Sequence, residues 1–311
     1  MIQASLQSDV PLIAEINAYL INSGGKRLRP LIALLCGQVM GSADDARQHK
    51  LATAVEFLHN ATLLHDDVVD SSNLRRGRKT THTVWGNATS ILVGDFLISR
   101  SLQLLTQIDS MPILRVFAET TNLIAEGEVL QLLHCKNPET SLAQYQEVIK
   151  RKTAAMFEAA ARGAAMIANC PSAVVTALSA FATHLGNAFQ MVDDALDYGS
   201  SSEPLGKNIG DDLAEGKITL PLLLALQQAD PNDAAFLRKL LSNTPSTGDQ
   251  SDKSSLLQGV HIVRNCGGVT GTLHLAAQEI NHALSQLSVV PPSPSTTALA
   301  QLAHFTLQRQ Q

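Results

Sequence analysis

Residues 56–80 read EFLHNATLLHDDVVDSSNLRRGRKT, and the interpretation of the whole chain depends on this stretch. Its apolar residues recur at spacings of three and four, which predicts an amphipathic helix. Asp66 and Asp70 then lie one turn apart on the same helical face, where two carboxylates repel each other unless a cation lies between them. Arg75 and Arg76 follow, and a pair of guanidinium groups suits an oxygen-rich anion such as a diphosphate. The stretch therefore predicts a site for a metal-bridged diphosphate.

The same acidic pattern occurs a second time in the chain. Residues 189–198 read FQMVDDALDY, which again places a DDxxD motif behind apolar helical residues. A solvated acidic helix end explains a single copy equally well, but two copies in similar helical contexts are difficult to explain as surface decoration. We expect the two helices to face each other across a cleft and to hold Mg2+ ions, which prefer carboxylate, water and phosphate oxygens.

The composition of the chain limits the classes of protein to which it can belong. Its 311 residues are 45% hydrophobic and 16% charged, which is enough for one large or two modest cores. The net charge of -5 and the lack of a basic stripe argue against nucleic-acid binding. The four cysteines are far apart without a CxxC pattern, so we expect neither a zinc site nor disulfides, and a reduced cytoplasmic environment fits. No signal peptide and no uninterrupted apolar stretch of about 18 to 20 residues is seen, so no membrane span is expected.

A glycine-rich basic turn forms a second candidate anion site. Residues 23–30 read SGGKRLRP, which places Lys26 and Arg29 beside a turn that precedes a helix starting at Pro30. Backbone amides at a helix start add to the side-chain charge in binding an anion. A basic surface loop is the alternative interpretation.

Helical periodicity continues through most of the chain, and no β-alternation of useful length occurs. We expect further helices over residues 9–22, 31–40, 48–68, 82–109, 112–134 and 141–168. A polar loop at 199–221 follows the second DDxxD motif, and loops of this length without secondary structure are often functional lids. The sequence therefore predicts an all-α fold.

Further polar residues on these helices are candidates for the cleft. His59 lies seven residues before Asp66 on the same helical face, although a helical histidine is more often packed or solvated. Lys152 and Thr153 offer an ammonium and a hydroxyl to a diphosphate, with a solvated polar turn as the alternative. Near the end of the helix expected at 112–134, the residues that could also face the cleft are Glu126, Glu128 and Gln131.

The order and content of these motifs resemble the trans-type isoprenyl diphosphate synthases, or polyprenyl synthetases. The resemblance rests on GGKRLRP, HNATLLHDDVVDSSNLRRG, GDFL, AEGEVLQL, RKTAAMFEAA, FQMVDDALDY and GKNIGDDLAEGKITLPLL. It covers nearly the whole chain and is strongest to the bacterial octaprenyl diphosphate synthases. It implies one polyprenyl synthetase domain over residues 1–311 with the all-α isoprenoid synthase fold, in which antiparallel helices surround a deep central cavity. It also implies a homodimer, to which a shortened first helix would contribute less than in related synthases.

The resemblance implies a role for each residue that matches a motif. The ligands of about three Mg2+ ions would be Asp66, Asp67, Asp70, Asp193, Asp194 and Asp197. The allylic diphosphate would be bound by Arg75, Lys152, Thr153, Gln190, Lys207 and Lys217. The isopentenyl diphosphate site would consist of Lys26, Arg29, His59 and Arg76. The residues expected to act in catalysis are Asp66, Asp67, Asp70, Lys152, Asp193, Asp194 and Lys207.

The implied reaction is a head-to-tail (1′-4) condensation of isopentenyl diphosphate onto an allylic diphosphate, with farnesyl diphosphate as the expected starter. Octaprenyl diphosphate or a near neighbour would be the product, for use in a quinone side chain. Breaking the allylic C–O bond leaves charge on the diphosphate, and Mg2+ with lysine and arginine stabilises that charge as it develops. The growing apolar chain needs a dry tunnel, which Ala- and Leu-rich helices can supply.

The residues below the first acidic motif predict the length of the product. Leu58, Ala61 and Thr62 lie one and more turns before Asp66, and short-chain members of the family tend to carry a bulky aromatic residue at the place of Ala61. A small side chain there predicts a deep tunnel and a long product. We expect the floor of the tunnel on the helix at 112–134, at Leu132 or Leu133.

Three other classes of protein are alternatives. A class I terpene cyclase also uses DDxxD and Mg2+, but it needs neither GGKRLRP nor Arg76 and usually lines its cavity with aromatic residues, which make up only 4% of this chain. A non-catalytic regulatory subunit of a heteromeric synthase often lacks some of the aspartates, whereas all six are present here. A plain helical scaffold protein would not require two intact acidic motifs.

Overall fold

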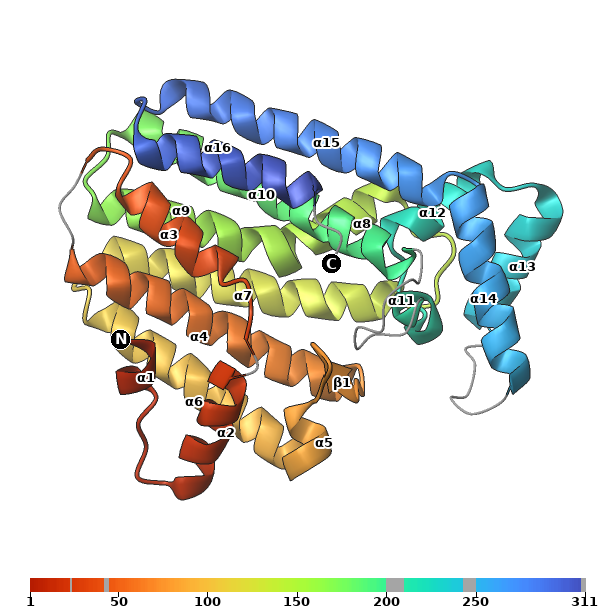
Figure 1. Ribbon diagram of the computed structural model, residues 1–311, viewed down its shortest axis with the longest axis horizontal. Coiled ribbons are helices and arrows are strands. Elements are labelled where there is room, and N and C mark those ends of the chain that lie inside the picture. The colour runs from red at the N-terminus through yellow and green to blue at the C-terminus, as the bar shows by residue number, and fades with distance from the viewer. Residues whose placement is uncertain (23, 42–44, 200–209, 243–249, 309–311) are drawn as a thin grey trace.

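Long helices run side by side along the longest axis of the protein, and they are connected by short turns (Figure 1). The structure is a computed structural model that describes residues 1–22, 24–41, 45–199, 210–242 and 250–308. In the N-terminal half the helices are α1 (Ile2–Ser5), α2 (Pro11–Asn22), α3 (Leu28–Gly37), α4 (Ala46–Val69), α5 (Thr81–Trp85), α6 (Asn87–Thr106), α7 (Met111–His134) and α8 (Leu142–Ile149). They are followed by the π-helix η1 (Lys150–Ala154), α9 (Ala155–Ile167), α10 (Ser172–Asp197), α11 (Asp211–Glu215), α12 (Leu220–Gln228), α13 (Pro231–Ser242), α14 (Gln250–Asn265), α15 (Gly268–Gln286), the 3-10 helix η2 (Leu287–Val289) and α16 (Pro294–Leu307). The predicted all-α class is confirmed.

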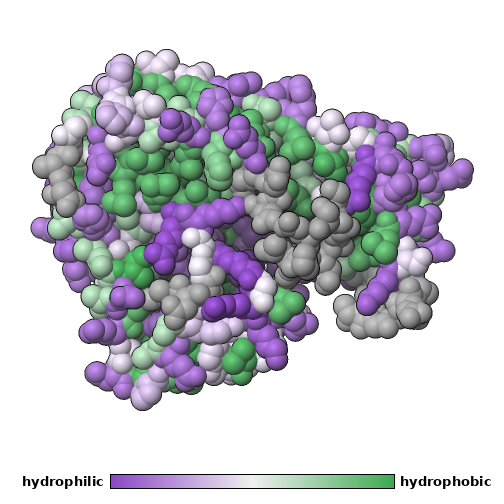
Figure 2. All heavy atoms as spheres, viewed as in Figure 1, coloured by the Kyte–Doolittle hydropathy of each residue, from purple (hydrophilic) through white to green (hydrophobic). Residues whose placement is uncertain are grey.

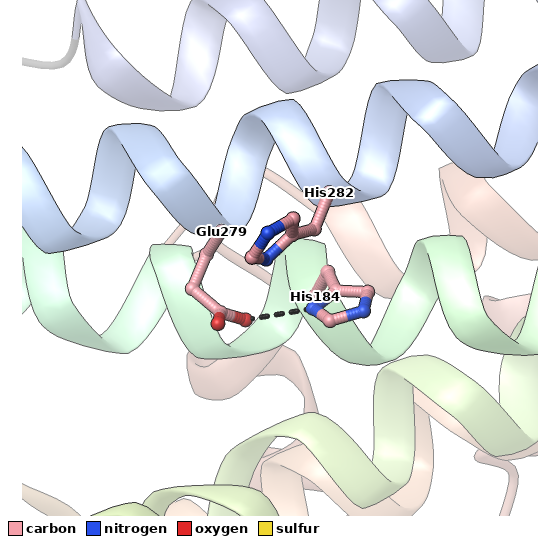
Figure 3. Close-up of side chains that lie close together, drawn as sticks. All are labelled: His184, Glu279 and His282. Atoms are coloured by element: carbon pink, nitrogen blue, oxygen red, sulfur yellow. Dashed lines mark hydrogen bonds and ion pairs between the residues drawn. The ribbon is translucent and has the colours of Figure 1, made fainter.

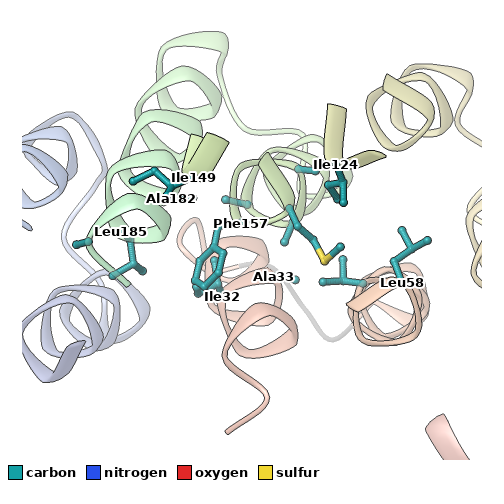
Figure 4. Packing of buried hydrophobic residues seen from close by; sticks show 14 of the residues in the cluster. Ile32, Ala33, Leu58, Ile124, Ile149, Phe157, Ala182 and Leu185 are labelled. Carbon is teal, nitrogen blue, oxygen red and sulfur yellow. The ribbon is translucent and has the colours of Figure 1, made fainter. Parts of the chain in front are cut away.

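The hydrophobic core is centred on the alanine-rich helix α9. This helix packs against α3, α4, α7 and α10, and its alanines after the first residue are fully buried, as expected for a helix that is apolar on nearly every side. Small side chains let the four neighbours approach closely, and larger residues from those neighbours fill the remaining space (Figure 4). Among the buried residues drawn there are Ile32, Leu58, Ile124, Phe157 and Leu185.

Two glycines let helices cross directly over the π-helix η1. A Cβ atom at Gly127 of α7 would lie 2.8 Å from the backbone nitrogen of Lys152, and one at Gly186 of α10 would lie 2.7 Å from the Cα atom of Ala154. Both distances are too short for real carbon contacts, so a larger residue would push α7 or α10 away from η1. The sequence predicts one continuous helix over 141–168, whereas the structure inserts η1 between α8 and α9, and π-helical turns are frequent at functional sites.

Other element boundaries also differ from the sequence-based prediction. The helix expected over 82–109 is divided into α5 and α6 at Gly86, whose φ of 87° interrupts the helical backbone. Helix α3 begins at Leu28 instead of Pro30, because a proline in the first turn loses no helical hydrogen bond. The loop predicted at 199–221 contains the short helix α11.

A two-residue hairpin follows α4 and was not predicted. Strand β1 (Leu74–Arg75) pairs antiparallel with β2 (Arg78–Lys79), in the register Leu74 with Lys79 and Arg75 with Arg78. Arg76 and Gly77 form the turn with φ values of 53° and 74°, as the tight turns of hairpins require. The turn sets the directions of the two neighbouring arginines.

Helix α6 is long and apolar enough to span a membrane, judged by its length and composition alone. It is the one helix with this property in the described ranges. It packs along α4. The hydroxyls of Ser90 and Ser101 donate hydrogen bonds of 3.1 and 3.0 Å to the carbonyl oxygens of Leu64 and Ala54 in α4. These contacts are those of a helix packed into a protein core. All four cysteines are free thiols.

We expect Gly186→Ala to destabilise the protein, although alanine normally favours a helix over glycine. The added methyl group would meet the backbone of Ala154, and overpacking of this kind costs about 1 to 3 kcal/mol in the free energy of unfolding. Gly94→Ala in α6 is the matched control, because the atoms nearest to its added methyl group belong to the imidazole of His65, a side chain that can rotate, and not to a backbone. Urea unfolding followed by circular dichroism measures both variants, and equal stability of the two would contradict the proposed close packing.

Candidate active site

The first DDxxD motif lies at the C-terminal end of α4, where its carboxylates point toward different partners. Asp66 lies 3.9 Å from the Lys152 ammonium, and Asp70 accepts a 2.7 Å hydrogen bond from Lys217 Nζ. Asp67 is buried and accepts a 2.7 Å hydrogen bond from Arg75 Nε in the hairpin. Asp66 and Asp70 therefore both meet lysines, whereas Asp67 holds the hairpin against the end of α4.

The second DDxxD motif lies at the C-terminal end of α10. Asp194 is buried, and its two carboxylate oxygens accept hydrogen bonds from Tyr145 (2.6 Å) and Gln190 (2.8 Å). Burial and the nearby Asp212 carboxylate raise the pKa of Asp194 to about 7. Asp197 accepts a 3.2 Å hydrogen bond from the backbone nitrogen of Asp212, which connects the motif to α11.

The π-helix η1 connects the two motifs. Lys152 Nζ donates hydrogen bonds of 2.7 Å to Glu128 and to Gln131, both on α7, and it faces Asp66. The adjacent Thr153 points to α10, where its hydroxyl donates a 2.8 Å hydrogen bond to Gln190 Oε1. Because Gln190 in turn contacts Asp194, polar contacts run from the first acidic motif to the second.

A second connection runs through Lys217. Its ammonium pairs with Asp70 and with Glu215, both at 2.7 Å, while α11 next to it is tied to Asp197. Burial lowers the pKa of Lys217, but the carboxylates of Asp212, Asp70 and Glu215 outweigh burial and raise the pKa above its ordinary value. Lys152 and Lys217 thus pair with the two ends of the first acidic motif, and the second motif is reached through Gln190 and the backbone of Asp212.

The predicted basic turn lies beside the hairpin. Arg76 donates a hydrogen bond to the carbonyl oxygen of Gly24, and a Cβ atom at Gly25 would lie 2.7 Å from the Arg76 guanidinium. Glycine at position 25 therefore makes room for the arginine. Lys26 in the same turn is exposed. Hydrophilic side chains gather around a hollow at the centre of one face of the protein (Figure 2).

Arg29 and His59 form a partly buried pair next to this turn. Arg29 Nη1 donates to His59 Nε2 at 3.2 Å, and the guanidinium carbon lies 4.6 Å from the centroid of the Phe157 ring. Burial lowers the pKa of Arg29 to about 10, although Glu56 and Asp193 oppose the shift. Burial and then the neighbouring Arg29, Arg76 and Arg75 hold the pKa of His59 well below its usual value, so the imidazole is neutral and accepts this hydrogen bond.

The residues predicted to set the product length are only partly where we expected them. Ala61 and Leu58 are buried, and the Thr62 hydroxyl bonds back to its own helix. Leu132 and Leu133 are 57% and 69% exposed. The prediction that they form a buried tunnel floor is wrong for the chain as described, because both side chains lie exposed in the last turn of α7. Lys207 lies outside the described residues.

Tyr145 of α8 is a site residue that the sequence analysis did not predict, as is Glu215, the partner of Lys217. The Tyr145 hydroxyl orients Asp194, yet α8 contains none of the acidic or basic motifs, so the sequence carries no signal for this contact. The predicted cleft-facing position of Glu128 and Gln131 agrees with their bonds to Lys152. Glu126 instead pairs with Arg151.

Comparison with known proteins identifies the family to which this chain belongs. Residues 10–258 match the polyprenyl synthetase family. The octaprenyl diphosphate synthase of Escherichia coli (strain K12) is 43% identical over 305 residues, which cover 98% of this chain and 92% of the relative. The all-trans-nonaprenyl-diphosphate synthase (geranyl-diphosphate specific) of Rhodobacter capsulatus is also 43% identical, over 99% of this chain and 92% of the relative.

A solved structure agrees with these sequence relatives. It is a polyprenyl synthase from Caulobacter crescentus CB15, complexed with calcium and isoprenyl diphosphate. This chain is 43% identical to it, with a TM-score of 0.94 and coverage of 100% of this chain and 93% of the other. The chain belongs to the polyprenyl synthetase family and is a prenyltransferase.

Proposed function

We propose that the protein condenses isopentenyl diphosphate head to tail (1′-4) onto an allylic diphosphate and makes octaprenyl diphosphate or a near neighbour. The observation that carries this proposal is the pair of acidic motifs. Lys152 and Lys217 pair with the first motif, Gln190 and Asp212 contact the second, and the partly buried Arg29–His59 pair completes the site. Such a site offers separate regions for two diphosphates. A quinone side chain is the proposed use of the product, and the whole chain, residues 1–311, is proposed to form one synthase domain.

The acidic residues fit divalent cations. Burial raises the pKa of Asp66, and Lys152 only partly offsets this effect, while burial and Asp212 raise the pKa of Asp194. The negative ends of the α4, α7 and α10 dipoles also lie at the site, which favours bound cations. We therefore assign a group of about three Mg2+ ions to Asp66, Asp67, Asp70, Asp193, Asp194 and Asp197. Bound Mg2+ would supply Lewis-acid stabilisation of the departing diphosphate.

The basic side chains divide into two groups around these aspartates. Lys152, Thr153, Gln190, Lys217 and Arg75 surround the acidic motifs and would donate hydrogen bonds to the allylic diphosphate, with Lys207 as a further proposed donor. Their present bonds to carboxylates would be exchanged for bonds to phosphate oxygens, which are equally good acceptors.

The second group is proposed to hold isopentenyl diphosphate and consists of Lys26, Arg29, His59 and Arg76. Neutral His59 accepts from Arg29 and thereby orients the guanidinium without adding a competing charge. The buried Nε atom of Arg29 has no hydrogen-bond partner among the described residues, so it remains available to a ligand. Holding the two substrates in adjacent regions aligns the double bond with the allylic carbon.

Exposed apolar side chains on consecutive helices support the proposal that the protein is a homodimer. They are Ile91, Leu92 and Leu102 on α6, and Met111, Leu123, Val129, Leu132 and Leu133 on α7. Apolar faces of this kind mark sites of association more often than they face water. A second copy of the chain would cover this α6–α7 surface.

The proposed activity is tested by incubating the purified protein with farnesyl diphosphate, labelled isopentenyl diphosphate and Mg2+, and by sizing the dephosphorylated products. We expect a ladder that ends near octaprenol. If no label is incorporated by folded protein with Mg2+ present, the alternative of a non-catalytic subunit gains support, and a partner chain is required.

We predict that Ala61→Phe shortens the product to about three or four isoprene units, because the ring would block the path of the growing chain. Ala61 is fully buried, so circular dichroism must first show that the variant is folded. The first condensation is expected to continue, since the diphosphate-binding residues are unchanged. A folded variant that still makes the full-length product would contradict the placement of the tunnel.

We predict that Asp194→Asn stabilises the metal-free protein at pH 8. The pKa of Asp194 is raised from 3.8 to about 7, so the folded state binds the proton more tightly than the unfolded state does. This contribution to stability is lost as the pH rises through about 7, and removal of the charge should restore on the order of 2 kcal/mol. Urea unfolding in EDTA at pH 5 and pH 8 measures the effect, which should be small at pH 5. Mg2+ should stabilise the wild type more than the variant. If the difference in stability between the variant and the wild type were the same at pH 5 and at pH 8, the raised pKa of Asp194 would be contradicted.

We predict that the double change Leu92→Glu and Val129→Glu converts the protein from a dimer to a monomer. Charged side chains on the α6–α7 surface would remain unpaired in the buried interface. Light scattering after size-exclusion chromatography measures the mass, with Leu257→Glu on the exposed face of α14 as the control. A wild type that is monomeric, or a variant that remains dimeric, would argue against this surface as the interface.

A further inference from the structure

Helices α10 and α15 carry a cluster of side chains that are suited to bind a transition metal. His184 projects from α10, and Glu279 and His282 project from α15 toward it (Figure 3). The distance from His184 Nδ1 to Glu279 Oε2 is 2.9 Å, and the two imidazole centroids are 5.3 Å apart. One potential ligand atom from each residue lies within 4.8 Å of the other two.

These distances are close to those of a formed site. Ligand atoms about 2.1 Å from a shared tetrahedral metal lie about 3.4 Å from one another. Contraction from 4.8 Å requires a small side-chain rotation, and His282 is exposed and can rotate. The helix backbones need not move.

The types of ligand distinguish this cluster from the acidic site. Imidazole suits zinc and other first-row transition metals, whereas Mg2+ prefers oxygen ligands. Glu279 and His282 lie three positions apart and share a face of α15, the Glu-x-x-His spacing used by metal sites in helix bundles. The cluster is also remote from the aspartates, since His184 precedes Asp193 on α10 by a helical distance of about 13 Å.

A neighbouring asparagine orients the carboxylate. Asn187 Nδ2 donates a 3.0 Å hydrogen bond to Glu279 Oε2, the kind of outer contact that aligns metal ligands. The buried Oδ1 atom of Asn187 has no hydrogen-bond partner in the described part of the chain. Burial raises the pKa of Glu279, but the hydrogen bonds from His184 and Asn187 outweigh it and lower the pKa overall, so the carboxylate is ionised at neutral pH.

We propose that His184, Glu279 and His282 bind one Zn2+ ion per chain, with the fourth position open to water. The ion would join α10, which carries the second acidic motif at its end, to α15 across their interface. It would therefore stabilise the fold without taking part in the condensation.

Zinc binding is measured by equilibrium dialysis of the full-length protein in excess Mg2+, which is expected to saturate the acidic motifs. We expect one Zn2+ per chain with micromolar or tighter affinity and a higher melting temperature. His282→Gln should weaken this binding at least tenfold without loss of folding, because His282 is exposed. His274→Gln is the matched control, since His274 lies on the same helix and contacts only Gln278 among the hydrogen bonds described.

Cobalt substitution shows whether the metal is bound by the two imidazoles and the carboxylate or by cysteine thiolates. Co2+ bound to two imidazoles and a carboxylate should give visible absorption without the near-ultraviolet band of a thiolate ligand. A thiolate band, equal binding by wild type and His282→Gln, or no retained zinc would each overturn the proposal. In the last case, His184 and Glu279 would form only a helix-to-helix ion pair.

Discussion

The mutual repulsion of carboxylates at the ends of α4 and α10 is the constraint on which the rest of the site depends. Helix periodicity places acidic residues one turn apart, and the convergence of helix C-termini adds further negative potential. Lys152 and Lys217 offset part of this charge by pairing with Asp66 and Asp70 of the first motif. The remaining negative charge makes the site suited to divalent cations and, through them, to diphosphate.

The core is built so that these lysines can reach the aspartates. Alanine-rich α9 allows α3, α4, α7 and α10 to surround it closely, and Gly127 and Gly186 let α7 and α10 contact η1. The extra residue of the π-helical turn changes the direction of the chain there, so that Lys152 faces α4 and α7 while Thr153 faces α10. In a regular α-helix without the extra residue, the side chains of Lys152 and Thr153 would point in other directions relative to α7 and α10.

The basic side of the site relies on burial as well as charge. The guanidinium of Arg29 lies over Phe157 and is aligned by neutral His59. The hairpin directs Arg75 to Asp67 and Arg76 to the glycine-rich turn. Two adjacent arginines of one hairpin therefore contact different parts of the site. This geometry keeps the basic region around Arg29 and Arg76 separate from the acidic motifs, as the proposed condensation of two diphosphates requires.

The sequence by itself determined the all-α class, the two helices that end in DDxxD, and the types of residue that surround them, because helical periodicity and motif spacing are local properties. Only the tertiary structure decided that Asp67 pairs with Arg75, that Tyr145 orients Asp194, and that His184 meets Glu279. It also placed Leu132 and Leu133 at exposed positions in the last turn of α7 instead of at the expected tunnel floor, because the direction of α7 relative to α4 is set by packing. Contacts between helices depend on how those helices are oriented in the core, and spacing along a single helix contains no information about that orientation.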